Sequence, residues 1–131
     1  MKIQRFAKQE IALRQIETAL SIYYQEGDLF SVITLAGAAE EILGQLLADR
    51  DGGSGHRGAI SSLMQILRPG RRKEPGREEF SGQEDACFVH LDPRHEARFL
   101  LGRAIDDYCS LTGAPSAGML RFQGEQPAKA R

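Results

Sequence analysis

The segment from Leu29 to about Ala48 constrains the fold most, because its apolar residues surround nearly the whole circumference of a helix. Asp28 or Ser31 can cap the start of this helix, since short polar side chains accept hydrogen bonds from free backbone N–H groups there. Its apolar residues are Leu29, Val32, Ile33, Leu35, Ala36, Ala39, Ile42, Leu43, Leu46 and Leu47. A helix that is apolar on most sides has to be enclosed by other elements. The sequence therefore predicts a helical bundle with this helix at its centre.

A second helix is predicted before it, from about Phe6 to Glu26, with Gly27 as its stop signal. Its main apolar face consists of Phe6, Leu13, Ile16, Leu20, Tyr23 and Tyr24. On a helical projection Ile11 and Ile22 fall outside this face and form a thinner second stripe. This helix is therefore expected to contact two neighbours.

Two further helices are predicted later in the chain. Residues 59–67 form a short one, which Pro69 ends. The last helix begins at Asp92 and Pro93, as a capping aspartate followed by a first-turn proline, and ends at Gly113. Its apolar face consists of Ala97, Leu100, Leu101, Ala104, Ile105, Tyr108 and Leu111. The preceding residues 86–91 fit neither a strand nor a helix clearly.

Two segments are predicted to lie outside the packed core. Residues 68–85 carry proline, glycine and charge with almost no apolar side chain, so they indicate a long exposed loop. Residues 114–131 are rich in Ala, Gly, Pro and Gln and are expected to form a flexible tail. With 131 residues in all, the prediction is an all-α bundle of about four helices in one domain, residues 1–113.

Composition limits the classes of function. A net charge of −1 argues against a surface built as a whole to bind nucleic acid or anionic lipid. We find no export signal or membrane anchor in the sequence, so no membrane partner is predicted. The only two cysteines, Cys87 and Cys109, form no CxxC pair, which fits a reducing compartment. These features together predict a cytoplasmic protein.

Glu40 is the polar residue that stands out in the central helix. It projects into the apolar sector near Ile33, Ala36 and Leu47, whereas Glu41 points toward more polar neighbours. A buried carboxylate has to be paired, hydrogen-bonded or neutral. The favoured interpretation is a structural pair with an arginine or tyrosine of another helix.

No cofactor or metal site is predicted. Cys87, His90, Asp92 and His95 are all metal-ligand types close in sequence, but their spacing matches no zinc pattern and a capped helix start explains them. The sequence also contains no nucleophile elbow, phosphate-binding loop or dinucleotide glycine pattern. The residue patterns themselves therefore favour no catalytic function.

Two stretches carry a resemblance to a known superfamily. Gly27-Asp28-Leu29 followed by Leu35-Ala36-Gly37-Ala38-Ala39-Glu40-Glu41-Ile42-Leu43, together with Ala104-Ile105-Asp106-Asp107-Tyr108, resembles bacterial helical proteins of the HEPN-like superfamily. The resemblance covers about half the chain and rests on the residue pattern along the helices rather than on catalytic residues. It implies a helical bundle that dimerises.

Active members of that superfamily cleave RNA without metal, using an arginine followed four to six residues later by a histidine. Only Arg50 and His56 have suitable spacing here, and a glycine-rich stretch separates them where the motif is not expected. We therefore expect a catalytically inert interaction or regulatory module. Two alternatives stay open: a ribonuclease of toxin or stress-response type that uses Arg50 and His56, and a phosphate or nucleic-acid binding module.

The binding alternative depends on Arg71, Arg72 and Lys73 in the basic half of the loop. Acidic residues later in the loop nearly cancel this charge.

A homodimer is predicted because some apolar residues lie outside the helix faces that form the core. Ile11 and Ile22 form the second stripe of the first helix, and Phe99 lies on the polar side of the last helix. Exposed apolar residues on long helices indicate a partner or a covering segment, and symmetric pairing is the commonest solution. Ile11, Ile22 and Phe99 are therefore the candidate dimer interface.

Overall fold

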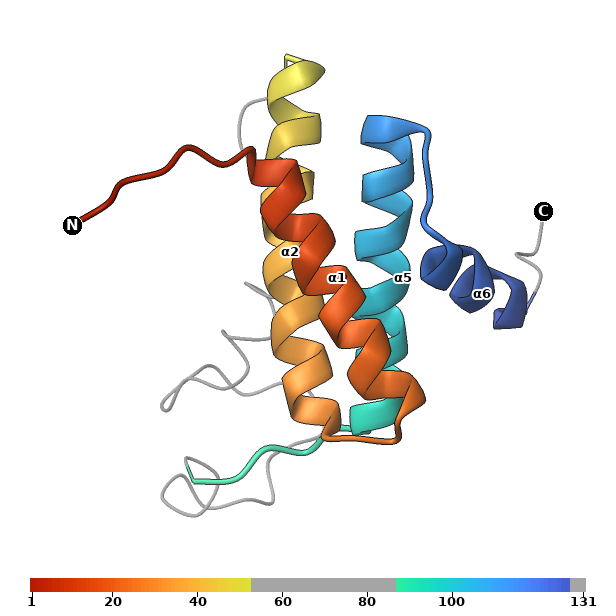
Figure 1. The fold of residues 1–131 in the computed structure, drawn as a ribbon. Coiled ribbons are helices and arrows are strands. Elements are labelled where there is room, and N and C mark those ends of the chain that lie inside the picture. The colour runs from red at the N-terminus through yellow and green to blue at the C-terminus, as the bar shows by residue number, and fades with distance from the viewer. Residues whose placement is uncertain (53–86, 128–131) are drawn as a thin grey trace.

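The computed structural model describes residues 1–52 and 87–127. Within them the chain forms four helices and no strand: α1 (Lys8–Tyr24), α2 (Leu29–Arg50), α5 (Pro93–Thr112) and α6 (Ala117–Glu125). The three long helices lie side by side, with α1 antiparallel to α2 and α5 parallel to α2 (Figure 1). The prediction of an all-α bundle is confirmed.

Helix α2 is the central element, as its apolar circumference predicts. It packs against both α1 and α5. Leu43, Val32 and Ala36 are fully buried, and Asp28 caps the helix by accepting hydrogen bonds from the backbone N–H groups of Phe30 and Ser31. By length and composition α2 could also cross a membrane, but the core helix of a bundle meets the same criteria.

The turn between α1 and α2 requires glycine. A Cβ atom on Gly27 would lie 2.8 Å from Cγ2 of Ile22, a distance that real Cβ atoms do not tolerate. The Gly27 N–H donates to the Ile22 carbonyl at 2.8 Å and closes the end of α1. The close approach at Gly27 therefore sets how α1 turns into α2.

The ends of α5 lie where the sequence predicts them. Asp92 accepts hydrogen bonds from the backbone N–H groups of Arg94 and His95, and Pro93 occupies the first turn. Gly113 adopts φ 67°, the left-handed conformation that ends helices and that glycine adopts without strain. In the segment just before α5, residues 87–92, Phe88 is exposed and Leu91 packs against the core.

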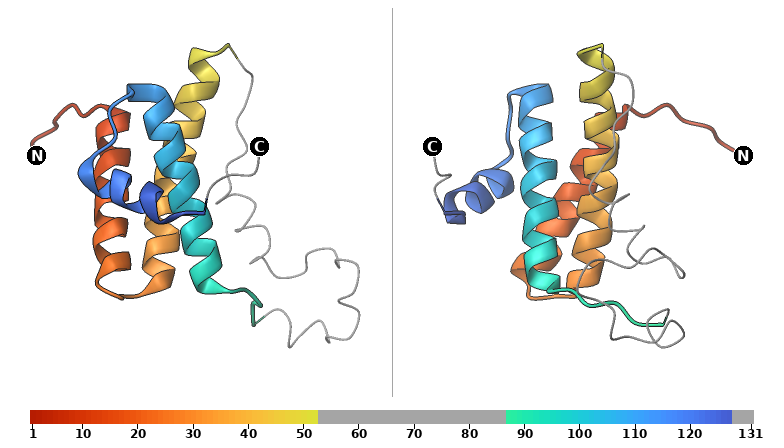
Figure 2. Two further views of the ribbon diagram at one scale, coloured as in Figure 1. Left: turned by 90° about the vertical axis from the view of Figure 1, so that its right-hand side faces the viewer. Right: turned by 180° about the vertical axis from the view of Figure 1, so that it is seen from behind.

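The prediction that residues 114–131 form a tail is wrong for α6. Ser116 caps this helix by accepting from the Met119 N–H, and Met119 and Phe122 are fully buried. Helix α6 lies crosswise over α1 and α5 and contacts both (Figures 1 and 2). Burying one methionine and one phenylalanine is enough to hold a short helix whose composition resembles a linker.

Other predictions fall outside the described residues. These are the short helix at 59–67, the charged loop at 68–85 and the last residues of the predicted tail, 128–131. The first helix starts slightly later than predicted, at Lys8, so Phe6 precedes it and is half exposed.

Candidate functional site

A shallow groove that exposes several apolar side chains runs between α1 and α2. We call it the α1/α2 face. It is lined by the apolar residues Phe6, Ile11, Ile22, Phe30 and Leu35 and by the polar residues Arg14, Gln15, Thr18, Asp28, Ser31 and Thr34. It contains two adjoining hollows, of about 330 and 470 Å³, which share Leu35. The face therefore runs from the start of α1 to the start of α2.

Three large apolar side chains on this face are exposed: Phe6 at 50%, Ile11 at 40% and Phe30 at 56%. Ile22 is half-buried between them and the core. A single exposed apolar residue is ordinary, but several along one groove are typical of an interaction surface.

The structure separates the three predicted interface residues. Ile11 and Ile22 line the same face, at its opposite ends. Phe99 lies on α5 and is 46% exposed, with the Arg103 guanidinium 5.8 Å from its ring centroid. Phe99 therefore belongs to a different patch, where a cation covers part of its ring.

One polar atom in the α1/α2 face lacks a partner. Gln15 lines the hollow beside Phe6 and Ile11, and its Oε1 is buried without a hydrogen-bond partner among the described residues. An unsatisfied buried acceptor is costly, so a donor from outside this chain would be favourable here. Sequence reasoning missed Gln15 because its carbonyl is enclosed by neighbours that only the fold brings together.

Glu40 is fully buried between α2 and α5. Arg103 Nη2 donates to Glu40 Oε1 at 3.1 Å, while the Arg103 side chain remains 44% exposed. Arg103 thus links the buried carboxylate to the surface. The pair holds two helices together and does not border the α1/α2 face.

Arg50 of the candidate catalytic pair takes part in helix packing. Its Nη1 donates to the Ser110 carbonyl at 3.0 Å and its Nε donates to Asp51 at 3.1 Å. These contacts hold the C-terminal end of α2 against the last turn of α5. His56, the other member of the pair, lies outside the described residues, as do the basic loop residues Arg71, Arg72 and Lys73.

The candidate metal ligands near α5 do not form a cluster. Asp92 is engaged as the helix cap, and Cys87, His90 and His95 are exposed. In the part of the chain that the structure describes, no group of three or more His, Cys, Asp or Glu side chains could hold a metal ion. Cys109 is half-buried, and burial together with nearby Asp106 raises the pKa of its thiol.

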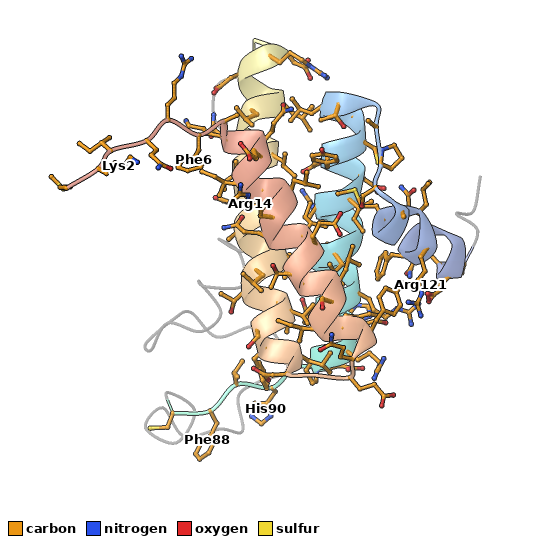
Figure 3. The ribbon with its side chains drawn as sticks, viewed as in Figure 1. Lys2, Phe6, Arg14, Phe88, His90 and Arg121 are labelled. Carbon is orange, nitrogen blue, oxygen red and sulfur yellow. The ribbon has the colours of Figure 1, made fainter. Side chains whose placement is uncertain are left out.

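An aromatic and charged cluster fixes α6 to the end of α1. Tyr24 donates to Glu125 at 2.8 Å. Arg121 of α6 (Figure 3) places its guanidinium 3.6 Å from the Tyr24 ring centroid. Burial, and then the hydrogen bond to Glu125, raise the pKa of Tyr24 to about 12. The ring of Phe122 packs edge-on against Tyr23, with centroids 5.8 Å apart. These contacts give the cluster a packing role.

Comparison of the chain with protein-family models, curated proteins and solved structures gives no match. The HEPN-like assignment therefore stays a prediction, and function has to be argued from the geometry of the chain itself.

Proposed function

We propose that this chain is a non-catalytic interaction module that assembles as a homodimer through the α1/α2 face. The observation that carries the proposal is the row of exposed Phe6, Ile11 and Phe30 along one groove. Covering them would remove apolar surface from water, which is the main favourable term in protein association.

A second copy is the favoured partner because a two-fold axis lets the same groove serve both partners, so one surface is enough to build the interface. The resemblance to HEPN-like proteins, which dimerise, supports the same assembly. The role would be regulatory, with the dimer presenting a defined surface to another molecule.

The contacts of Arg50 support the absence of catalysis. Its guanidinium binds the Ser110 carbonyl and Asp51, so its position is explained by helix packing. An arginine that stabilises the transition state of RNA cleavage has to face the phosphate that develops charge. A guanidinium that holds two helix ends together is less available for that role.

Two measurements on the purified chain test this proposal. Light scattering at micromolar concentration should give twice the mass of one chain, and RNA incubated with the chain in EDTA should stay intact. Metal-independent cleavage that His56→Ala abolishes would contradict the non-catalytic assignment and support the ribonuclease alternative. A folded monomer at these concentrations would contradict the dimer.

A further inference from the structure

Residues 1–7 form an extended arm that leaves the start of α1 and runs away from the bundle (Figures 1 and 2). Every residue of the arm is exposed, including the apolar Met1 and Ile3. Lys2 (Figure 3) and Arg5 also belong to the arm, whose sequence contains no acidic residue. The arm is thus a basic segment whose Met1 and Ile3 are not covered by its own chain, whereas Phe6 at its base lines the α1/α2 face.

The α1/α2 face has the opposite charge at its far end. The hollow that contains Ile22 and Phe30 is bordered by the exposed carboxylate of Asp28, and the exposed Glu26 precedes it in the same turn. Hydrogen bonds from the Ser31 hydroxyl and then the Phe30 N–H lower the pKa of Asp28, so this carboxylate is charged at neutral pH. The far end therefore offers apolar contact and negative charge, which complement the arm.

We propose that the arm of each copy lies in the α1/α2 face of the other copy, so that the homodimer is held by a reciprocal exchange of arms. This inference rests on the proposed function, because it requires a dimer. The two-fold axis passes near Ile11, where the arm and the near end of the face meet. Lys2, near the tip of the arm of one copy, then approaches Glu26 and Asp28 of the other, and Arg5 lies nearer the base of the arm.

Residues 1–7 are long enough to reach along the α1/α2 face. Seven extended residues span about 23 Å at about 3.3 Å each. Helix α1 has 17 residues, which corresponds to a length of about 25 Å at 1.5 Å per residue. An arm that enters at the Phe6 end can therefore reach the hollow beside Phe30.

An extended arm can also supply a hydrogen-bond donor to the buried Gln15 Oε1. Its backbone presents N–H groups along both edges, because no helix or sheet of its own chain uses them. One of these N–H groups can donate to the buried Gln15 Oε1 in the near hollow. The arm thus offers the face apolar contact, positive charge for its far end and a hydrogen-bond donor for Gln15.

Disulfide trapping between two different chains tests the exchange. In a background with Cys87→Ser and Cys109→Ser, one chain carries Ile3→Cys in the arm and the other carries Thr34→Cys, an exposed position in the far hollow. The proposal predicts that mild oxidation of the mixture gives the mixed disulfide as the main crosslinked product. A product made mainly of two Thr34→Cys chains would show that the faces meet directly, and would overturn the exchange.

A chain that carries both cysteine substitutions tests whether the arm folds back on its own face. The exchange predicts a covalent dimer on oxidation, whereas a monomer with an internal disulfide would contradict it.

Charge reversal provides an independent test that does not use cysteine. Lys2→Glu with Arg5→Glu should raise the dimer dissociation constant at least about tenfold, because the charge of both arms is reversed beside the negative far end of the face. Glu26→Lys should weaken the dimer in the same direction, and the triple variant should recover part of the lost affinity. If the wild type is a dimer and none of the three variants changes its dissociation constant, the exchange is overturned and the proposed dimer stands. A monomeric wild type would overturn both.

Discussion

Arg103 and Glu40 form an ion pair of 3.1 Å that joins α5 to α2, and Arg14 and Glu10 form a pair of the same length within α1. The two pairs differ in burial, since Glu40 is 0% exposed and Glu10 is 46% exposed. Exposed pairs contribute little because water screens them, whereas a buried carboxylate depends on its partners. The protein thus contains a buried pair and a matched exposed control.

We predict that Glu40→Gln lowers the free energy of unfolding by about 1–3 kcal/mol, since the Arg103 hydrogen bond loses its charged acceptor in a buried place. Glu10→Gln should cost about 0.5 kcal/mol or less, as expected for an exposed pair within one helix. Urea denaturation of both variants measures the difference. Equally small losses of unfolding free energy for the two variants would show that Glu40 is hydrated in solution.

Leu43→Ala tests whether α2 is the central helix. Leu43 is fully buried in the core, so its truncation leaves a cavity and should cost about 2–5 kcal/mol. Gln45→Ala is the control, because Gln45 is exposed on the same helix and its substitution should stay within about 0.5 kcal/mol. A loss below about 0.5 kcal/mol for Leu43→Ala would show that α2 is peripheral.

Phe122→Ala tests the packing of α6. Phe122 is fully buried against α1, so the substitution should cost about 3–5 kcal/mol if α6 is part of the cooperative unit. Leu120→Ala, at an exposed position of the same helix, should change the stability by less than about 0.5 kcal/mol. Thermal unfolding of both variants distinguishes a docked helix from a tail, for which the two losses would be equally small.

The raised pKa of Tyr24 gives a prediction at high pH. Burial and the Glu125 carboxylate favour the neutral phenol, so this contribution to stability is present below pH 10 and is lost as the pH rises toward 12. Glu125→Gln removes the charge and should lower the pKa of Tyr24 from about 12 toward the ordinary 10.0. NMR titration of ¹³Cζ-labelled tyrosine, assigned with Tyr24→Phe, measures this. An unchanged pKa would show that Tyr24 and Glu125 are not in contact.

The long helices could be predicted from the sequence because their signals are local. Asp28 and Asp92 are capping residues, Gly113 is a helix stop, and the apolar face of α5 recurs at helical spacing. Glu40 could likewise be placed toward the apolar side of α2 from its position alone. Its partner Arg103 could not be identified, because that choice depends on how α5 packs against α2.

Helix α6 was not predicted because its composition resembles a linker. The available signal was Ser116 as a cap, followed by Met119 and Phe122 three residues apart. These two side chains are buried where α6 crosses α1 and α5, a contact that exists only after folding. The prediction that Phe6 belongs to the first helix is wrong for a similar reason. Its helical spacing gives no sign that α1 begins at Lys8.

The homodimer through the α1/α2 face is the central claim, and Ile11→Asp tests it most directly. Ile11 is exposed in the single chain, so the substitution should leave the fold intact while it places a charge at the proposed interface. Phe99→Asp is the control, at a similarly exposed position on α5 outside this face.

Sedimentation equilibrium at micromolar concentration, with circular dichroism to confirm folding, should give a dimer for the wild type and for Phe99→Asp, and a folded monomer for Ile11→Asp. A wild-type monomer, or a dimer that Ile11→Asp leaves unchanged, would contradict the claim.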